Sequence, residues 1–144
     1  MNKYYILIAI LAVIIIILVA VLFWPAPAKS PVVVQPPADI EILNVKAGDV
    51  IKSPLKITGV VRGNGWAGFE GQVGTVHVMD ANNNELAVGI LTATTDWMAL
   101  PTSFEANITF AGIPGQPGSL VFKNENPSGE ALRDKTLTLS IIFQ

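Results

Sequence analysis

Hydrophobic and polar positions follow two different patterns along this chain. From Tyr4 to Trp24 every residue is aliphatic or aromatic, and the run contains no charge, proline or glycine. As a helix it would be about 31 Å long at about 1.5 Å per residue, close to the ~30 Å hydrocarbon core of a bilayer. In lipid such a run must be helical, because every backbone N–H and C=O needs a partner within the segment. We therefore expect residues 1–24 to form a short tail and a transmembrane helix that contacts the lipid bilayer through residues 4–24.

The charges that flank this run predict its orientation. Lys3 precedes it closely and Lys29 follows at a greater distance, so the positive charge favours a cytoplasmic N-terminus. The rest of the chain would then lie outside a cell membrane that it crosses once. Ala26-Pro27-Ala28 has the small-x-small form of a signal-peptidase site, but a cleaved signal has a shorter apolar region of about 7–15 residues. A retained anchor is favoured, and cleavage after Ala28 is the alternative.

Residues 25–37 are rich in proline and predict a linker. Proline ends the helix and favours an extended polyproline conformation, with a reach of about 40 Å for this length. Proline-rich segments also bind aromatic-lined grooves of other domains, but a stalk is the favoured interpretation.

From Ala38 onward the apolar positions repeat every second residue. Within residues 102–110, for example, Phe104, Ala106, Ile108 and Phe110 fall on one face and polar residues on the other, which is typical of a half-buried strand. The predicted strands are Ile40–Val45, Leu55–Val61, Gln72–Met79, Glu85–Ala93, 102–110, Ser119–Lys123 and 136–143. Gly-, Asn- and Pro-rich turns separate them, and no stretch has helical periodicity with caps. Residues 38–144 therefore predict an all-β domain, an antiparallel immunoglobulin-like β-sandwich of about seven strands.

Composition and charge exclude several classes of function. The chain has 9 basic and 11 acidic residues, a net charge of −2, and no cysteine. A scattered and mildly acidic surface excludes nucleic acid as the expected partner, since phosphates need a clustered basic face. Without cysteine there are no disulfides, thiolate metal sites or cysteine nucleophiles. The absence of motifs for a serine nucleophile, a metal or a phosphate predicts a protein that is not an enzyme and carries no cofactor.

Two polar motifs have plain structural interpretations. His77 alternates with Val76 and Val78, so we expect it on the solvent side of a strand and without a catalytic role. Residues 80–84, Asp-Ala-Asn-Asn-Asn, resemble the first half of a calcium loop, but Glu85 stands where that loop needs glycine. A hairpin turn, in which asparagine tolerates the left-handed region, is favoured, and no metal is expected.

Two loops hold the candidate ligand-binding residues. Trp66, Phe69 and Glu70 lie in a glycine-dense segment, and Asp96 and Trp97 lie in another. Exposed aromatic rings beside an acid are typical of surfaces that bind sugars or proteins. A small domain without disulfides also needs large core side chains, so core or loop-packing roles are favoured for both tryptophans.

The order of several short motifs resembles the immunoglobulin-like domain of bacterial spore germination proteins. The residues that carry the resemblance are Ile40–Ile42, Gly48–Val50, Ser53–Gly59, Gly65–Glu70, Asp80–Asn82, Asp96–Met98, Phe104 and Asn126–Gly129. The chain departs from the family pattern at Asn83 or Asn84, where glycine is common, and at Ser140, where proline is common. The resemblance implies an immunoglobulin-like fold on a membrane-attached or secreted bacterial protein, and it brings no catalytic residues.

Together these features predict a membrane-anchored, extracytoplasmic and non-catalytic module for protein binding or assembly at the bacterial cell envelope. The alternative is a module that binds cell-wall polysaccharide through the aromatic loops.

Overall fold

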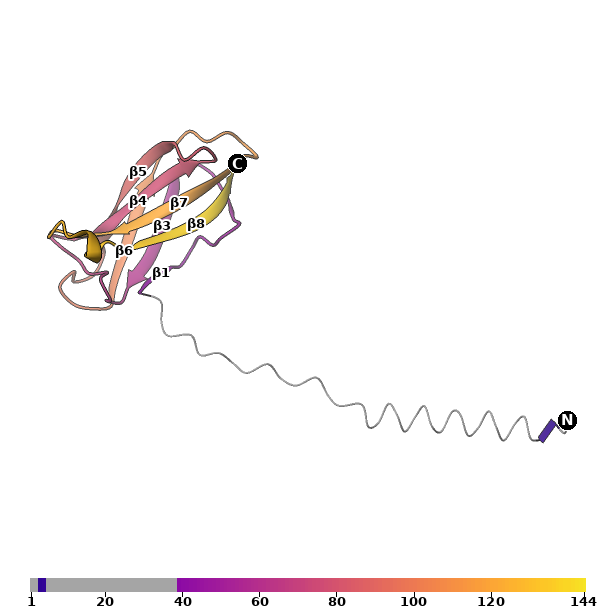
Figure 1. The fold of residues 1–144 in the computed structure, drawn as a ribbon, viewed down its shortest axis with the longest axis horizontal. Coiled ribbons are helices and arrows are strands. Elements are labelled where there is room, and N and C mark those ends of the chain that lie inside the picture. Colours follow the sequence, from indigo (N-terminus) through magenta and orange to yellow (C-terminus); the bar gives the residue numbers. More distant parts are fainter. Residues whose placement is uncertain (1–2, 5–38) are drawn as a thin grey trace. The chain divides into compact units, whose positions relative to one another are not determined.

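The computed structural model describes residues 3–4 and 39–144 (Figure 1). The predicted linker and all of the predicted transmembrane run except Tyr4 lie outside the described residues. Within the described part of the chain, no helix combines the length and the hydropathy that crossing a membrane requires.

The domain is all-β, as predicted, with a single short 3-10 turn (η1, Ala131–Arg133) among the described residues. Its strands are β1 (Ile40–Ile42), β2 (Val50–Ile51), β3 (Leu55–Val61), β4 (Gln72–Asp80), β5 (Glu85–Ala93), β6 (Thr102–Ile108), β7 (Pro117–Asn124) and β8 (Thr136–Phe143). Each of the seven predicted strands is present, and β3, β5 and β8 have the predicted bounds. The first is shorter than expected, because the chain leaves the ladder after Ile42.

The predicted count of about seven strands and the predicted all-antiparallel pairing both need correction. An eighth strand, β2, pairs in parallel with β8 at one edge of the sheet. The N–H of Ile142 bonds to the carbonyl oxygen of Asp49 at 2.9 Å, and the N–H of Gln144 bonds to that of Ile51 at 2.8 Å. A two-residue strand shows no alternation of its own, so the pattern of apolar positions could not reveal it.

The eight strands are connected by hydrogen bonds in the order β1-β3-β6-β5-β4-β7-β8-β2. Strand β5 joins the two parts of this curled sheet. Most of β5 pairs with β4, but its last residues, Thr92 and Ala93, pair with Glu105 and Phe104 of β6. Figure 1 shows β5 and β4 on one side, with β3 and β6 crossing behind β7 and β8.

The core consists of the inward faces of the strands, and the predicted alternation is confirmed there. Phe104, Ala106, Ile108 and Phe110 are buried, as the period-two pattern predicts. The other buried apolar side chains are Ile40, Val45, Ile51, Ile57, Val61, Trp66, Val73, Val76, Val78, Leu91, Leu120, Phe122, Ile141 and Phe143. All of them lie within the compact unit Gln35–Gln144, so this unit has a hydrophobic core of its own.

Candidate functional site

Three loops meet at the end of the domain that holds Asp39, its first described residue. Residues 62–71, 94–101 and 125–135 connect strand ends that the antiparallel pairing places side by side (Figure 1). Asp39 lies at the same end, because its carbonyl oxygen accepts a 2.8 Å bond from the N–H of Arg62. Its carboxylate accepts a 2.7 Å bond from Nδ2 of Asn64. We call these three loops the proximal tip, and they contain all five predicted ligand-binding residues.

Trp66 is part of the core and not of the tip surface. Its exposed fraction is 2%, and its backbone N–H donates a 3.0 Å hydrogen bond to the carbonyl oxygen of Gly63. A small cleft beside it is also lined by Ile40 of β1 and Leu137 of β8, so Trp66 lies close to the first and the last strand. The favoured core interpretation is confirmed for Trp66, whose ring has no face open to a ligand.

Phe69 and Glu70 lie on a tight turn that leads into β4. The N–H of Phe69 bonds to the carbonyl oxygen of Gln72 at 2.7 Å, and the N–H of Gln72 returns a bond of 3.0 Å. Glu70 and Gly71 between them have φ angles of 50° and 85°, which is typical of a two-residue hairpin turn. Both predicted side chains, Phe69 and Glu70, are exposed.

Asp96 and Trp97 lie on the neighbouring loop. The carboxylate of Asp96 accepts a 2.9 Å bond from the N–H of Met98, which fixes a local turn. A methyl group placed on Gly68 would lie 2.5 Å from the carbonyl oxygen of Trp97, so the two loops are in close contact. The structure therefore brings the half-buried Trp97 near Phe69 and Glu70. A role of these four residues in ligand binding stays a prediction.

A groove of about 380 Å³ adjoins the same loops. Asn124 organises it: Nδ2 donates to the carbonyl oxygens of Gly65 at 2.7 Å and Arg133 at 3.0 Å, and Oδ1 accepts from the N–H of Lys135 at 2.8 Å. Leu132 forms part of its wall and is 97% exposed. This segment has no periodic pattern of apolar residues, because a short 3-10 turn has no apolar face to predict.

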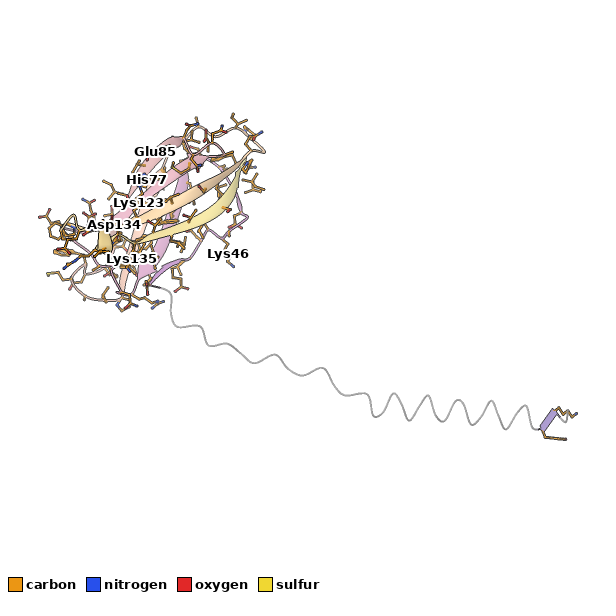
Figure 2. The ribbon with its side chains drawn as sticks, viewed as in Figure 1. Lys46, His77, Glu85, Lys123, Asp134 and Lys135 are labelled. Carbon is orange, nitrogen blue, oxygen red and sulfur yellow. The ribbon has the colours of Figure 1, made fainter. Side chains whose placement is uncertain are left out.

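The outer faces of β4 and β5 hold a hydrogen-bonded trio that the sequence did not predict, Thr75, His77 and Glu85; Figure 2 labels His77 and Glu85. Nδ1 of His77 lies 2.6 Å from Oε2 of Glu85, and Nε2 lies 3.1 Å from Oγ1 of Thr75. His77 is on the outer side of the sheet, as predicted, but its side chain is only 15% exposed. The spacing between His77 and Glu85 spans a hairpin, so only the pairing of β4 with β5 brings the two together.

This trio has the distances of a hydroxyl, a base and an orienting carboxylate. Acyl transfer also needs N–H donors aimed at the developing oxyanion. Here the strand that carries Thr75 and His77 is paired with β5 on one side and β7 on the other, which commits its backbone N–H groups to the sheet. The arrangement can fix these side chains on the outer face of the sheet.

Apolar side chains surround His77 on the same face. Val88 lies opposite His77 on β5, and Val121 lies opposite it on β7. Val88 is 48% exposed and Ile90, two residues further along β5, is 52% exposed. We define the outer patch as Met79, Val88, Ile90 and Val121, with His77 at its centre.

A glycine explains why β5 turns these side chains outward. Within residues 88–91 of β5, Gly89 and Leu91 are buried, whereas Val88 and Ile90 are exposed although together they are bulkier. A methyl group on Gly89 would lie 2.5 Å from Cγ1 of Ile108, so the Ile108 side chain fills the space above this glycine. The face of β5 that carries Gly89 therefore packs against the core, and the face that carries Val88 and Ile90 is left on the outside.

The hairpin after β4 has the structure that was favoured over a calcium loop. Oδ1 of Asp80 accepts bonds of 2.8 Å from the N–H groups of Asn82 and Asn84, and Asn83 has a φ of 62°. The side-chain amide and the N–H of Asn84 hold the pKa of the Asp80 carboxyl below its ordinary value. Within residues 3–4 and 39–144, no three or more acidic or histidine side chains gather as a metal site would require.

Comparisons with protein-family models, curated proteins and solved structures found no match to this chain. The resemblance to the spore germination immunoglobulin-like domain therefore stays a prediction.

Proposed function

We propose that this protein is a single-pass, membrane-anchored and non-catalytic module that holds one immunoglobulin-like domain outside the bacterial cell membrane. Its role is to bind or assemble with a protein partner of the cell envelope, through the outer patch. The uncharged run 4–24 supports the anchor, and the proline-rich segment 25–37 supports a stalk.

Three features support an immunoglobulin-like sandwich as the finer description of the fold. A short strand, β2, lies parallel to the last strand, β8, at an edge. Strand β5 changes partner from β4 to β6, which lets one strand belong to two facing layers. Buried side chains come from both layers, as when Ile108 of β6 covers Gly89 of β5.

The outer patch is the observation that carries the binding proposal. The solvent face of an antiparallel sheet is ordinarily polar. Here Val88 and Ile90 stand about half exposed on that face, beside the paired His77 and Glu85. Apolar area around a fixed polar group is typical of protein interfaces, where the apolar part supplies affinity and the polar part sets orientation.

Binding of cell-wall polysaccharide remains the alternative, and the structure lends it less support. Sugar sites present flat rings to the ligand, but Trp66 is buried. Phe69 and the half-buried Trp97 are the aromatic side chains that this end can offer to a sugar. The polysaccharide proposal predicts that Trp97→Ala abolishes binding of the folded domain to purified cell wall.

Photo-crosslinking in cells tests the protein-binding proposal. A photoreactive residue at Val88 should give one discrete crosslinked product, and the same residue at Val50 should not. Val50 is a matched control because it is 60% exposed, also on a strand, and outside the outer patch. A photoreactive residue at Val121 should form the same product, and the double substitution Val88→Thr/Ile90→Thr should abolish it. The double substitution should leave the free energy of unfolding within about 0.5 kcal/mol, since both sites are on the surface.

Equal crosslinking from positions 88 and 50, or none from either, would refute the outer patch as an interface. A product of twice the chain mass would identify the partner as a second copy. The proposed location is tested separately with added protease, which should cleave the domain in intact cells. A control from which outer envelope layers have been stripped is needed, because a thick envelope can shield the domain.

A further inference from the structure

Exposed apolar side chains gather at the proximal tip. Phe69 is 42% exposed, Met98 75%, Leu100 51% and Leu132 97%. One or more come from each of the three loops, and none of them belongs to the outer patch. Single exposed apolar residues need no explanation, but a group of them at one end of a domain marks a contact surface.

Contacts between the loops hold this group of side chains together at one tip. A methyl group on Gly63 would lie 3.3 Å from Cδ1 of Leu100, which places the Leu100 side chain against the loop 62–71. Ala67 of that loop and Leu132 line the same groove. The close contact of Gly68 with Trp97 joins the remaining side of the loop 94–101 to Phe69. The four side chains therefore lie on adjacent loops of one tip.

The position of Asp39 indicates what covers this surface. Asp39 is bonded to the tip through Arg62 and Asn64, and the proline-rich segment and the apolar run precede it directly in the sequence. A chain tethered to a membrane by about 14 residues experiences that membrane at a high effective concentration, so even a weak contact becomes populated. We propose that the proximal tip docks on the surface of the lipid bilayer, with Phe69, Met98, Leu100 and Leu132 in the headgroup region.

The charges of the tip define the kind of bilayer contact. The three loops carry three basic residues and five acidic ones, so the tip is mildly acidic and has no excess of positive charge to attract anionic lipid: Arg62, Arg133 and Lys135 against Glu70, Asp96, Glu125, Glu130 and Asp134. Arg133 is also paired with Glu130 at 2.8 Å. Docking should therefore depend on apolar burial in neutral headgroups, and it should not strengthen with anionic lipid or weaken with added salt. This inference rests on the proposed membrane anchor, and it concerns a surface separate from the outer patch.

The absence of cysteine allows a direct test with the full-length chain. Single substitutions Met98→Cys and Leu132→Cys carry an environment-sensitive fluorophore, and the protein is reconstituted into phosphatidylcholine vesicles. Ile113→Cys is the matched control, because Ile113 is 71% exposed on the loop at the opposite end of the domain. Lipid with a nitroxide at its headgroup should quench the labels at positions 98 and 132 several-fold more than the label at 113. Adding Leu132→Glu should reduce the quenching at position 98.

Equal quenching at all three positions, in protein that stays with the vesicles after an alkaline wash, would refute docking and leave the anchor intact. Labels at 98 and 132 that are shielded from aqueous quenchers but not quenched by the lipid would indicate a protein contact, and this would also refute docking. Release of the whole chain by the alkaline wash would refute the anchor and the docking with it. A strand-type circular dichroism spectrum for each labelled protein verifies that the substitutions at these exposed sites leave the domain folded.

Discussion

Substitution of Trp66 tests whether this tryptophan has a structural or a binding role. The burial of its side chain sets the expected loss in the free energy of unfolding. A tryptophan buries about 150–250 Å², which at about 25 cal/mol per Å² corresponds to about 4–6 kcal/mol as an upper bound. With only 2% of Trp66 exposed, nearly all of that area is lost from the core on substitution by alanine. We expect Trp66→Ala to lower the free energy of unfolding by about 3–5 kcal/mol, the range measured for large aromatic residues in cores.

Urea unfolding of the unit Gln35–Gln144, followed by circular dichroism, measures this loss. Leu132→Ala on the same tip is the control and should change the free energy of unfolding by less than about 0.5 kcal/mol, because its side chain is 97% exposed. Trp66→Phe should cost less than Trp66→Ala, since the phenyl ring keeps part of the buried area. If Trp66→Ala costs no more than the control, the indole is not a core element, and a binding role for it must be considered again.

Three further predictions concern the sheet and its hairpin. Gly89→Ala should lower the free energy of unfolding by about 1–3 kcal/mol, because the added methyl group would lie 2.5 Å from the Ile108 side chain and overpack the core. The loss should be smaller in an Ile108→Ala background, and a double-mutant cycle from urea unfolding measures this coupling. Gly59→Ala should also cost about 1–3 kcal/mol, since its methyl group would lie 2.5 Å from a carbonyl oxygen of β1, and an unchanged urea midpoint would contradict this packing. Asp80→Ala should destabilise the domain at neutral pH through loss of the bonds from Asn84, as measured by the thermal midpoint. Because the pKa of Asp80 is lowered on folding, its stabilisation is present above the unfolded pKa and is lost as the pH falls through the folded pKa, so the difference between the two proteins should narrow in acid.

The sequence was sufficient for most strands, because alternation of apolar and polar residues is a local property of each strand. It predicted the burial of Phe104 and Ile108 and the bounds of β3, β5 and β8. It was insufficient for β2, which has two residues, and for the pairing of His77 with Glu85, which depends on the register between β4 and β5. Contacts of that kind are set by the whole fold and leave no trace in the spacing of residues along the chain.

The candidate sites show the same division between local and distant causes. Hydrophobicity alone would favour the interior for Val88 and Ile90 and the surface for Gly89, and the structure has the opposite. The reason lies outside β5: Ile108 of β6 occupies the volume that a side chain at position 89 would need. A strand that could have buried two branched residues instead exposes them around a histidine–glutamate pair. This arrangement leaves apolar area in water, which lowers stability unless a partner covers it. Packing against Ile108 accounts for the direction in which β5 faces, and the apolar area that this leaves exposed is the reason why we propose a protein partner for the outer patch.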